Sequence, residues 1–300
     1  MRNVALALVL AVLSTACKQE TPPAAGGGPV RVSVSIPPLV SVVRAIGGDL
    51  IEVSSLMSEG DDPHTFSPTP QAISSLRAAH LFFTVGVDYE KAVCDKIEPM
   101  FPQLHIVNVA ISVDKLAAAE HEHEAEHGDA EHHHHEEHLS DPHVWLSLPN
   151  LIAVAEQVKL ALQKDLPEKS EVFAERFAAY RAQLESRHRE FAEQLQGLAT
   201  RSFCVYHPVF GYFARDYDLE QHVVEVDGKT PTPRQLRILS EEAKEENFKV
   251  IFVQPQFTER PAQAIAELIG GTVTRVNPLA ENPLVVLTQA VDALASQKAK

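Results

Sequence analysis

The chain has 300 residues, 22% of them charged, and a formal net charge of −15 at pH 7. A nucleic-acid-binding protein needs a basic patch, and the sequence has none, so we expect no nucleic-acid partner. The charge is uneven: residues 120–138 carry eight Asp and Glu and no Lys or Arg, and without them the charge is −7.

The N-terminus predicts export and a membrane anchor. A basic start precedes an apolar run, residues 4–13, which is too short to span a bilayer and is followed by small residues and Cys17. This order is typical of a secretory signal peptide, here residues 1–16. Cysteine after small residues resembles a bacterial lipoprotein box and predicts lipidation of Cys17, although Ser14 stands where such a box has Leu. The alternative is a plain signal peptide with an incidental cysteine. Pro and Gly make residues 17–29 a flexible tether.

From Val30 onward, strand and helix patterns alternate, which predicts an α/β fold with mostly parallel sheets flanked by helices. The pattern occurs twice, on either side of a helical middle section. The predicted strands are 30–36, 51–57, 81–86, 105–110, 202–207, 222–226, 249–254 and 272–277. The predicted helices are 39–46, 71–79, 89–100, 149–165, 169–197, 211–215, 231–247, 260–269 and 284–295.

The predicted helix 169–197 is unusually long, about 43 Å at 1.5 Å per residue. Its apolar residues recur at spacings of three, four and seven and are Phe173, Phe177, Tyr180, Leu184, Phe191 and Leu195. A coiled coil is one interpretation, but a rigid link between an N-terminal lobe, 30–168, and a C-terminal lobe, 198–300, fits the flanking pattern better. Cys94 and Cys204 fall in different lobes, so we expect two buried free thiols.

Eight of the 15 histidines lie in the acidic segment 120–138, called here the His-rich segment. It has no apolar residue larger than Ala and is predicted to be a disordered loop. Imidazole and carboxylate both bind Zn²⁺, Cu²⁺ and Ni²⁺, so we predict auxiliary metal capture rather than a purification tag or a solvated acidic loop. The histidines concerned are His121, His123, His127, His132, His133, His134, His135 and His138.

Three other histidines are predicted metal ligands. His64 and His143 each stand in the phrase Asp-Pro-His-x-aromatic, in a loop before a helix. Proline restricts the backbone before each ligand, and the nearby aspartate, Asp62 or Asp141, is a candidate partner for the other ring nitrogen. His207 follows a strand, where parallel sheets bind ligands. The remaining histidines are predicted to be structural or at the surface; they are His80, His105, His188 and His222.

Five phrases give the exported body a family resemblance: DPHTFSPTP (62–70), DPHVWLSLPN (141–150), YHPVFGYFARDYDL (206–219), PTPRQL (231–236) and VIFVQPQF (250–257). The chain resembles the ZnuA-like zinc/manganese receptors of ABC importers, which are cluster A-I solute-binding proteins (periplasmic solute-binding protein family 9). The resemblance implies two α/β lobes joined by one long helix, with the metal between them.

The resemblance also implies ligand roles. His64 and His143 would be the ligands of the N-terminal lobe and His207 the first of the C-terminal lobe. Manganese members usually have Glu at the His207 position, so histidine there favours Zn²⁺ over Mn²⁺. The fourth family ligand is an Asp in a Leu-Asp-Pro-Leu phrase, where this chain has Asn277. The fourth position is therefore Asn277, a water, or a group from the His-rich segment.

We therefore expect a binding protein rather than an enzyme. It would capture Zn²⁺ in the periplasm or at the cell surface, held to a bacterial membrane as a lipoprotein, and deliver it as a monomer to an ABC transporter permease. The alternatives are a manganese or other divalent-metal receptor, a zinc-dependent hydrolase, and a surface metal buffer. No Glu adjoins His64, His143 or His207 as an obvious general base for hydrolysis.

Overall fold

The computed structural model describes residues 28–117, 140–225, 229 and 231–298. The predicted signal peptide, Cys17, the tether up to residue 27 and the His-rich segment lie outside the described residues. Within the described part, no helix is long and apolar enough to cross a membrane.

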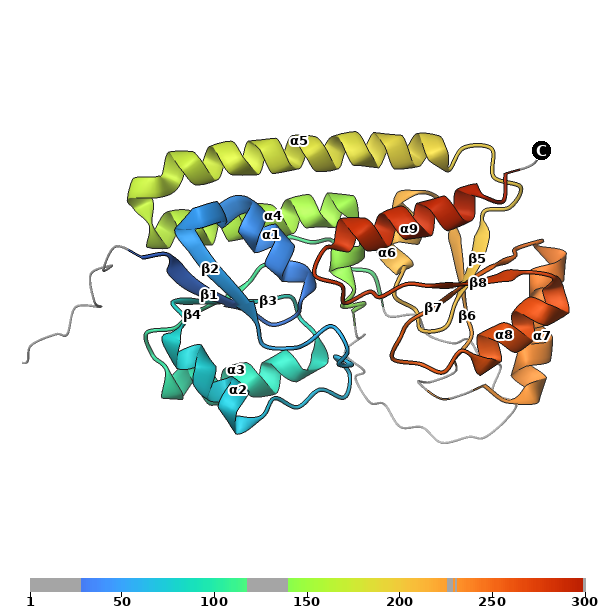
Figure 1. Cartoon of the computed structure of the whole chain (residues 1–300), viewed down its shortest axis with the longest axis horizontal. Coiled ribbons are helices and arrows are strands. Elements are labelled where there is room, and N and C mark those ends of the chain that lie inside the picture. Colours follow the sequence, from blue (N-terminus) through green and yellow to red (C-terminus); the bar gives the residue numbers. More distant parts are fainter. Residues whose placement is uncertain (1–27, 118–139, 226–228, 230, 299–300) are drawn as a thin grey trace, which may run out of the picture.

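Two four-stranded parallel sheets lie side by side (Figure 1), which confirms the predicted α/β class. The strand orders are β2-β1-β3-β4 and β6-β5-β7-β8. The strands of the first sheet are β1 (Val30–Val34), β2 (Ile51–Ser55), β3 (Leu81–Thr84) and β4 (His105–Asn108). Those of the second are β5 (Ser202–Val205), β6 (Glu220–Val223), β7 (Val250–Val253) and β8 (Thr272–Arg275).

Helices connect the strands and cover the sheets (Figure 1). They are α1 (Pro38–Gly47), α2 (Pro70–Ser75), α3 (Asp88–Met100), α4 (Leu148–Asp165), α5 (Ser170–Gln194), α6 (Gly211–Asp216), α7 (Pro233–Glu245), α8 (Arg260–Ile269) and α9 (Pro283–Ala295). Many begin at sequence signals for a helix start: Thr69, Ser147, Thr232 and Asn282 cap α2, α4, α7 and α9 through side-chain hydrogen bonds, each followed by proline within the first two positions.

The long helix is present, but it is shorter than predicted. α5 has 25 residues. Residues 167–169 form a separate 3-10 turn before it, and Leu195 is the C-cap of α5. It runs across both halves of the molecule, packing on α4 and α1 at one end and α9 at the other (Figure 1). Phe173, Leu184 and Phe191 are fully buried beneath it.

The main hydrophobic core is continuous between the halves. It includes residues of both sheets, α1, α4, α5 and α9, while a smaller cluster lies between the second sheet, α7 and α8. Trp145 joins the halves directly: its Nε1 donates a hydrogen bond of 2.7 Å to the carbonyl of Pro278. Shared burial of this kind restricts the movement of one half against the other. Cys94 and Cys204 are free, as predicted, although only Cys204 is fully buried.

The strand orders fix where a ligand can bind. In open parallel sheets, ligands bind outside the carboxyl ends of the strands, at the point where the strand order reverses. In the second sheet this point lies between β5 and β7. His207 follows β5 by two residues and Gln254 directly follows β7, so both lie at this position.

Candidate metal centre

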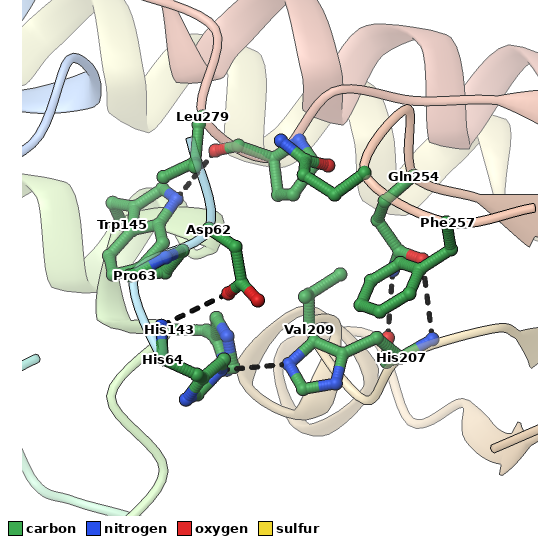
Figure 2. A pocket seen from close by; sticks show the side chains of 12 residues that line it. Asp62, Pro63, His64, His143, Trp145, His207, Val209, Gln254, Phe257 and Leu279 are labelled. Atoms are coloured by element: carbon green, nitrogen blue, oxygen red, sulfur yellow. Dashed lines mark hydrogen bonds between the residues drawn. The ribbon is translucent and has the colours of Figure 1, made fainter. Parts of the chain in front are cut away.

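His64, His143 and His207 converge on one point between the halves (Figure 2) and are called here the three-histidine centre. Their ligand atoms all lie within 4.8 Å of one another. His64 Nε2 and His207 Nε2 are 3.0 Å apart. Two nitrogens bound to one tetrahedral zinc at about 2.0–2.1 Å lie roughly 3.3 Å apart. The three rings can therefore hold a single ion after only small shifts.

Each of the three rings contacts a carboxylate through its other nitrogen. Nδ1 of His64 lies 2.8 Å from Asp88, and Nδ1 of His143 lies 2.8 Å from Asp141. Nδ1 of His207 lies 2.5 Å from Glu225. A carboxylate at Nδ1 holds the proton there, orients the ring and leaves the Nε2 lone pair for a metal.

The predicted pairing of Asp141 with His143 is confirmed, whereas that of Asp62 with the His64 ring is wrong. Asp62 Oδ1 accepts a hydrogen bond from the backbone N–H of His64, and Oδ2 accepts one from Thr65 Oγ1. A short acidic side chain often closes a loop in this way. Asp62 therefore shapes the loop that presents His64, while Asp88, from the start of α3, orients the ring.

Three residues that support the centre were not predicted from the sequence. Asp88 and Glu225 each follow a strand end by a few residues, a position that could have indicated a role. Gln254 is 1% exposed and brackets the backbone of His207 (Figure 2). Its Oε1 accepts from the His207 N–H at 3.2 Å, and its Nε2 donates to the His207 carbonyl at 2.8 Å. These two hydrogen bonds fix the backbone position of His207 just after β5.

The three ligands differ in exposure. His143 is buried, and burial lowers its pKa despite the opposing effect of Asp141, so its neutral, metal-binding form is favoured. The side chain of His207 is 16% exposed and that of His64 33%. An ion arriving from solvent therefore meets His64 first.

The cavity at the centre is small and largely apolar. Its volume is about 20 Å³, little more than the roughly 10–15 Å³ that one water molecule requires. Its apolar lining residues are Pro63, Trp145, Val209, Phe257, Pro278 and Leu279, most of them labelled in Figure 2. As it stands, the cavity has room for an ion or a water.

Asn277 is not among the residues that line this cavity. Its Oδ1 accepts a hydrogen bond of 3.1 Å from the backbone of Leu279, and its Nδ2 lies 3.5 Å from the carbonyl of Glu59. The amide oxygen would have to leave Leu279 to reach an ion. Asn277 as the fourth ligand therefore stays a prediction.

Most of the histidines predicted to be structural have partners of their own. His105 Nδ1 lies 2.9 Å from Asp165, and His188 Nδ1 lies 2.9 Å from the hydroxyl of Tyr217. Both are pairs that a folded protein uses to satisfy an imidazole. His222 Nε2 lies 2.8 Å from Glu246, and its ring stacks on Phe248.

Comparison with known proteins decides the family. Residues 32–295 match the model of the family described as "Zinc-uptake complex component A periplasmic". The chain belongs to this family. It consists of metal-binding transport receptors and is not an enzyme family.

Individual relatives agree with the family match. The chain is 30% identical over 261 residues, 84% of its length, to "Zinc-binding protein AdcA" of Streptococcus pyogenes serotype M3. It is 28% identical over 92% of its length to "Zinc-binding lipoprotein AdcA" of Streptococcus pneumoniae. The chain spans about half of these relatives, 51% and 55% of their lengths. A crystal structure of ZnuA has a TM-score of 0.80 and 31% identity, with 90% of this chain and 100% of that one covered. A zinc-bound ZnuA variant lacking residues 138–173 of its own sequence has a TM-score of 0.80 and 30% identity, with 91% and 99% covered.

Proposed function

We propose that this protein is an extracytoplasmic receptor that binds one Zn²⁺ ion as cargo and delivers it to an ABC importer. The observation that carries the proposal is the three-histidine centre itself, in which three Nε2 atoms meet and every Nδ1 contacts a carboxylate. The small cavity supports a bare ion as the cargo. A relative named as zinc-binding AdcA and the zinc-bound ZnuA structure agree with it.

The donor atoms favour Zn²⁺ over Mn²⁺. Imidazole suits zinc, whereas manganese prefers carboxylate, carbonyl and water oxygens. Asp88, Asp141 and Glu225 contact the Nδ1 atoms, and their part is to orient the rings. Three neutral imidazole nitrogens and one exchangeable fourth ligand complete a tetrahedral site. The fourth ligand is Asn277, a water, or a group of the His-rich segment.

The wider assignment follows from the sequence and the family. We assign residues 1–16 as a signal peptide, Cys17 as the lipidated residue and 17–29 as a tether. The lobes are residues 30–168 and 198–300, with 169–197 as the linking segment. The protein acts as a monomer in the periplasm or at the cell surface, and its partner is an ABC transporter permease. A family described as periplasmic and a relative named a lipoprotein support this location.

Binding rather than hydrolysis is the function that the local contacts support. A hydrolase needs a free general base beside the ion. Here Asp88, Asp141 and Glu225 all contact a ligand ring, and Asp62 closes its own loop.

Competitive titration tests the proposal. Zn²⁺ and Mn²⁺ are titrated against a chelating indicator of known affinity for the wild type, for His64→Ala and for the matched control His105→Ala, which removes a carboxylate-paired histidine elsewhere. We expect tight Zn²⁺ binding in the wild type and the control, its loss in His64→Ala, and weaker Mn²⁺ binding throughout. A preference for Mn²⁺, or unchanged tight Zn²⁺ binding in His64→Ala, would refute the assignment.

Deleting the His-rich segment separates a receptor from a metal buffer. A receptor keeps one tight site per chain after residues 120–138 are removed and loses only weakly bound zinc. A buffer loses most of its tight binding. Equilibrium dialysis at two free zinc concentrations, one low and one high, measures both quantities.

A further inference from the structure

A loop of the N-terminal half is joined to the C-terminal half beside the three-histidine centre. Residues 58–64, called here the His64 loop, follow β2, and Asp62, Pro63 and His64 from this loop line the cavity. Gln256 lines the same cavity from the C-terminal half, three residues after the end of β7. The cavity is therefore bounded by parts of both halves, and contacts between these parts hold it closed.

The side chain of Gln256 binds the His64 loop through two backbone carbonyls. Its Nε2 donates a hydrogen bond of 3.2 Å to the carbonyl of Glu59 and one of 3.4 Å to that of Asp61. Among the described residues its Oε1 has no hydrogen-bond partner, so the hydrogen bonds of this side chain go to the loop. A carbonyl oxygen only accepts, so the amide must present its NH₂ group there. These two hydrogen bonds are called here the Gln256 latch.

Glu59 adds further connections between the halves at the same place. Its carbonyl lies 3.5 Å from Nδ2 of Asn277, and its carboxylate accepts a hydrogen bond of 2.7 Å from the backbone N–H of Glu281. Arg44 of α1 forms an ion pair with Glu281. Glu59 itself is exposed. The His64 loop is therefore held to the C-terminal half by polar contacts at the surface, where water competes for every donor and acceptor.

The segment around His143 is held across the halves in a different way, by buried contacts. The carbonyl of Asp141 accepts a hydrogen bond of 2.8 Å from the buried hydroxyl of Tyr212, and Trp145 is fully buried where it bonds to the second half. Segments held by buried contacts open at a high free energy, whereas segments held by solvent-exposed hydrogen bonds open at a low one. His64, the most exposed ligand, is therefore the one that can leave the ion first.

We propose that Gln256 is a positioning residue that keeps the His64 loop closed over the bound ion and thereby sets the rate of zinc release. While the Gln256 latch is formed, His64 stays on the ion together with the other two ligands. When the latch opens, His64 moves away with its loop and leaves the ion on two histidines, from which it dissociates more readily. The inference rests on the proposed receptor function, which requires both retention and release of the ion.

Zinc release from the full chain tests the inference. Protein loaded with one equivalent of Zn²⁺ is mixed with an excess of a chromogenic chelator in a stopped-flow instrument, and the rate that no longer depends on chelator concentration is taken. Gln256→Met removes the latch and keeps a side chain of similar size. The matched control Gln263→Met removes a glutamine that bonds to Glu259 within the C-terminal half.

We expect Gln256→Met to release zinc on the order of tenfold faster than the wild type, the effect of losing two exposed hydrogen bonds, and Gln263→Met to stay within about twofold. A Gln256→Met rate within about twofold of a zinc-binding wild type would overturn the inference alone. A wild type that takes up no zinc at one equivalent would instead refute the proposed function, on which the inference depends.

Two further measurements separate a latch from a general loss of structure. Hydrogen exchange of the zinc-free protein, followed by mass spectrometry, should be faster in Gln256→Met for peptides covering residues 58–66 and unchanged for those covering 141–150. In a His64→Ala background, Gln256→Met should change the residual zinc affinity by less than about twofold, because the loop then carries no ligand. Faster exchange throughout the chain, or an undiminished effect in His64→Ala, would overturn the inference.

Discussion

The carboxylates behind the three ligand rings should control zinc affinity, and Glu225 offers the clearest test. It is 4% exposed and lies 2.5 Å from Nδ1 of His207. Glu225→Gln keeps an oxygen that can accept the Nδ1 proton, so the ring keeps its tautomer and position. The variant removes only the negative charge. We expect weaker Zn²⁺ binding with an unchanged fold.

The geometry sets the size of the effect. With the ion about 2.0–2.1 Å beyond Nε2, the carboxylate oxygen of Glu225 lies roughly 6–7 Å from it. A divalent ion and a unit charge at that distance attract by about 1 kcal/mol in water and about 5 kcal/mol at an effective dielectric constant of 20. Loss of an orienting partner typically weakens metal binding about 10–100-fold, or about 1.4–2.8 kcal/mol, which lies within this range.

The assay is competition for Zn²⁺ with a chelating indicator, performed on the wild type, Glu225→Gln and Asp165→Asn. The last variant removes the charge from a carboxylate that pairs with His105 outside the centre, so it controls for a change in net charge. Zinc affinity in Glu225→Gln within twofold of the wild type would refute the reasoning. So would an equal loss in Asp165→Asn, because the effect would then be one of overall charge.

Three further predictions concern selectivity, stability and thiol reactivity. His207→Glu combined with Glu225→Gln, which avoids two adjacent carboxylates, should lower the ratio of Zn²⁺ to Mn²⁺ affinity on the order of tenfold or more; competitive titration measures it. Leu184→Ala removes a fully buried side chain of α5 and should cost about 2–5 kcal/mol in denaturant unfolding, whereas Gln183→Ala on the exposed face should cost little. Burial raises the pKa of Cys94 to about 11. Alkylation of Cys94 at pH 8 should therefore be roughly 200-fold slower than that of a free thiol and should accelerate toward pH 11. Peptide mass spectrometry follows the reaction. A Cys94 rate at pH 8 equal to that of a free thiol would contradict the last prediction.

The elements were predictable because their signals are local. β-branched runs, helix caps and closing glycines lie within a few residues of one another, and the strands β1 to β8 all fall at or near the predicted positions. The error at β6 is instructive. The apolar run after His222 suggested a strand over 222–226, but pairing with β5 starts it at Glu220 and ends it at Val223. Ending there frees Glu225 to reach His207.

The candidate ligand histidines could be singled out for a similar reason, and the carboxylates that contact them could not. The Asp-Pro-His phrase is local, so His64 and His143 could be found from sequence. The contact from His64 to Asp88 spans 24 residues, and that from His207 to Glu225 spans 18. Such contacts depend on how neighbouring strands bring their ends together. The nearest aspartate in sequence, Asp62, is two residues from His64 but bonds to its backbone rather than to its ring.

Because Asn277 is neutral, the carboxylates that orient the three histidine rings matter more for zinc affinity. A family receptor with Asp at this position would set one negative charge directly on the ion. Here the three ligands are neutral imidazoles, and Asn277 is neutral as well. Releasing its hydrogen bond to Leu279 would cost only about 0.5–1.5 kcal/mol, so it can still turn toward an ion, but it brings no charge. With Asn277 or a water as the fourth ligand, the negative charge that balances Zn²⁺ comes from Asp88, Asp141 and Glu225, one ring away from the ion. Zinc affinity in this chain should therefore depend more on those three carboxylates than in a receptor whose fourth ligand is an aspartate.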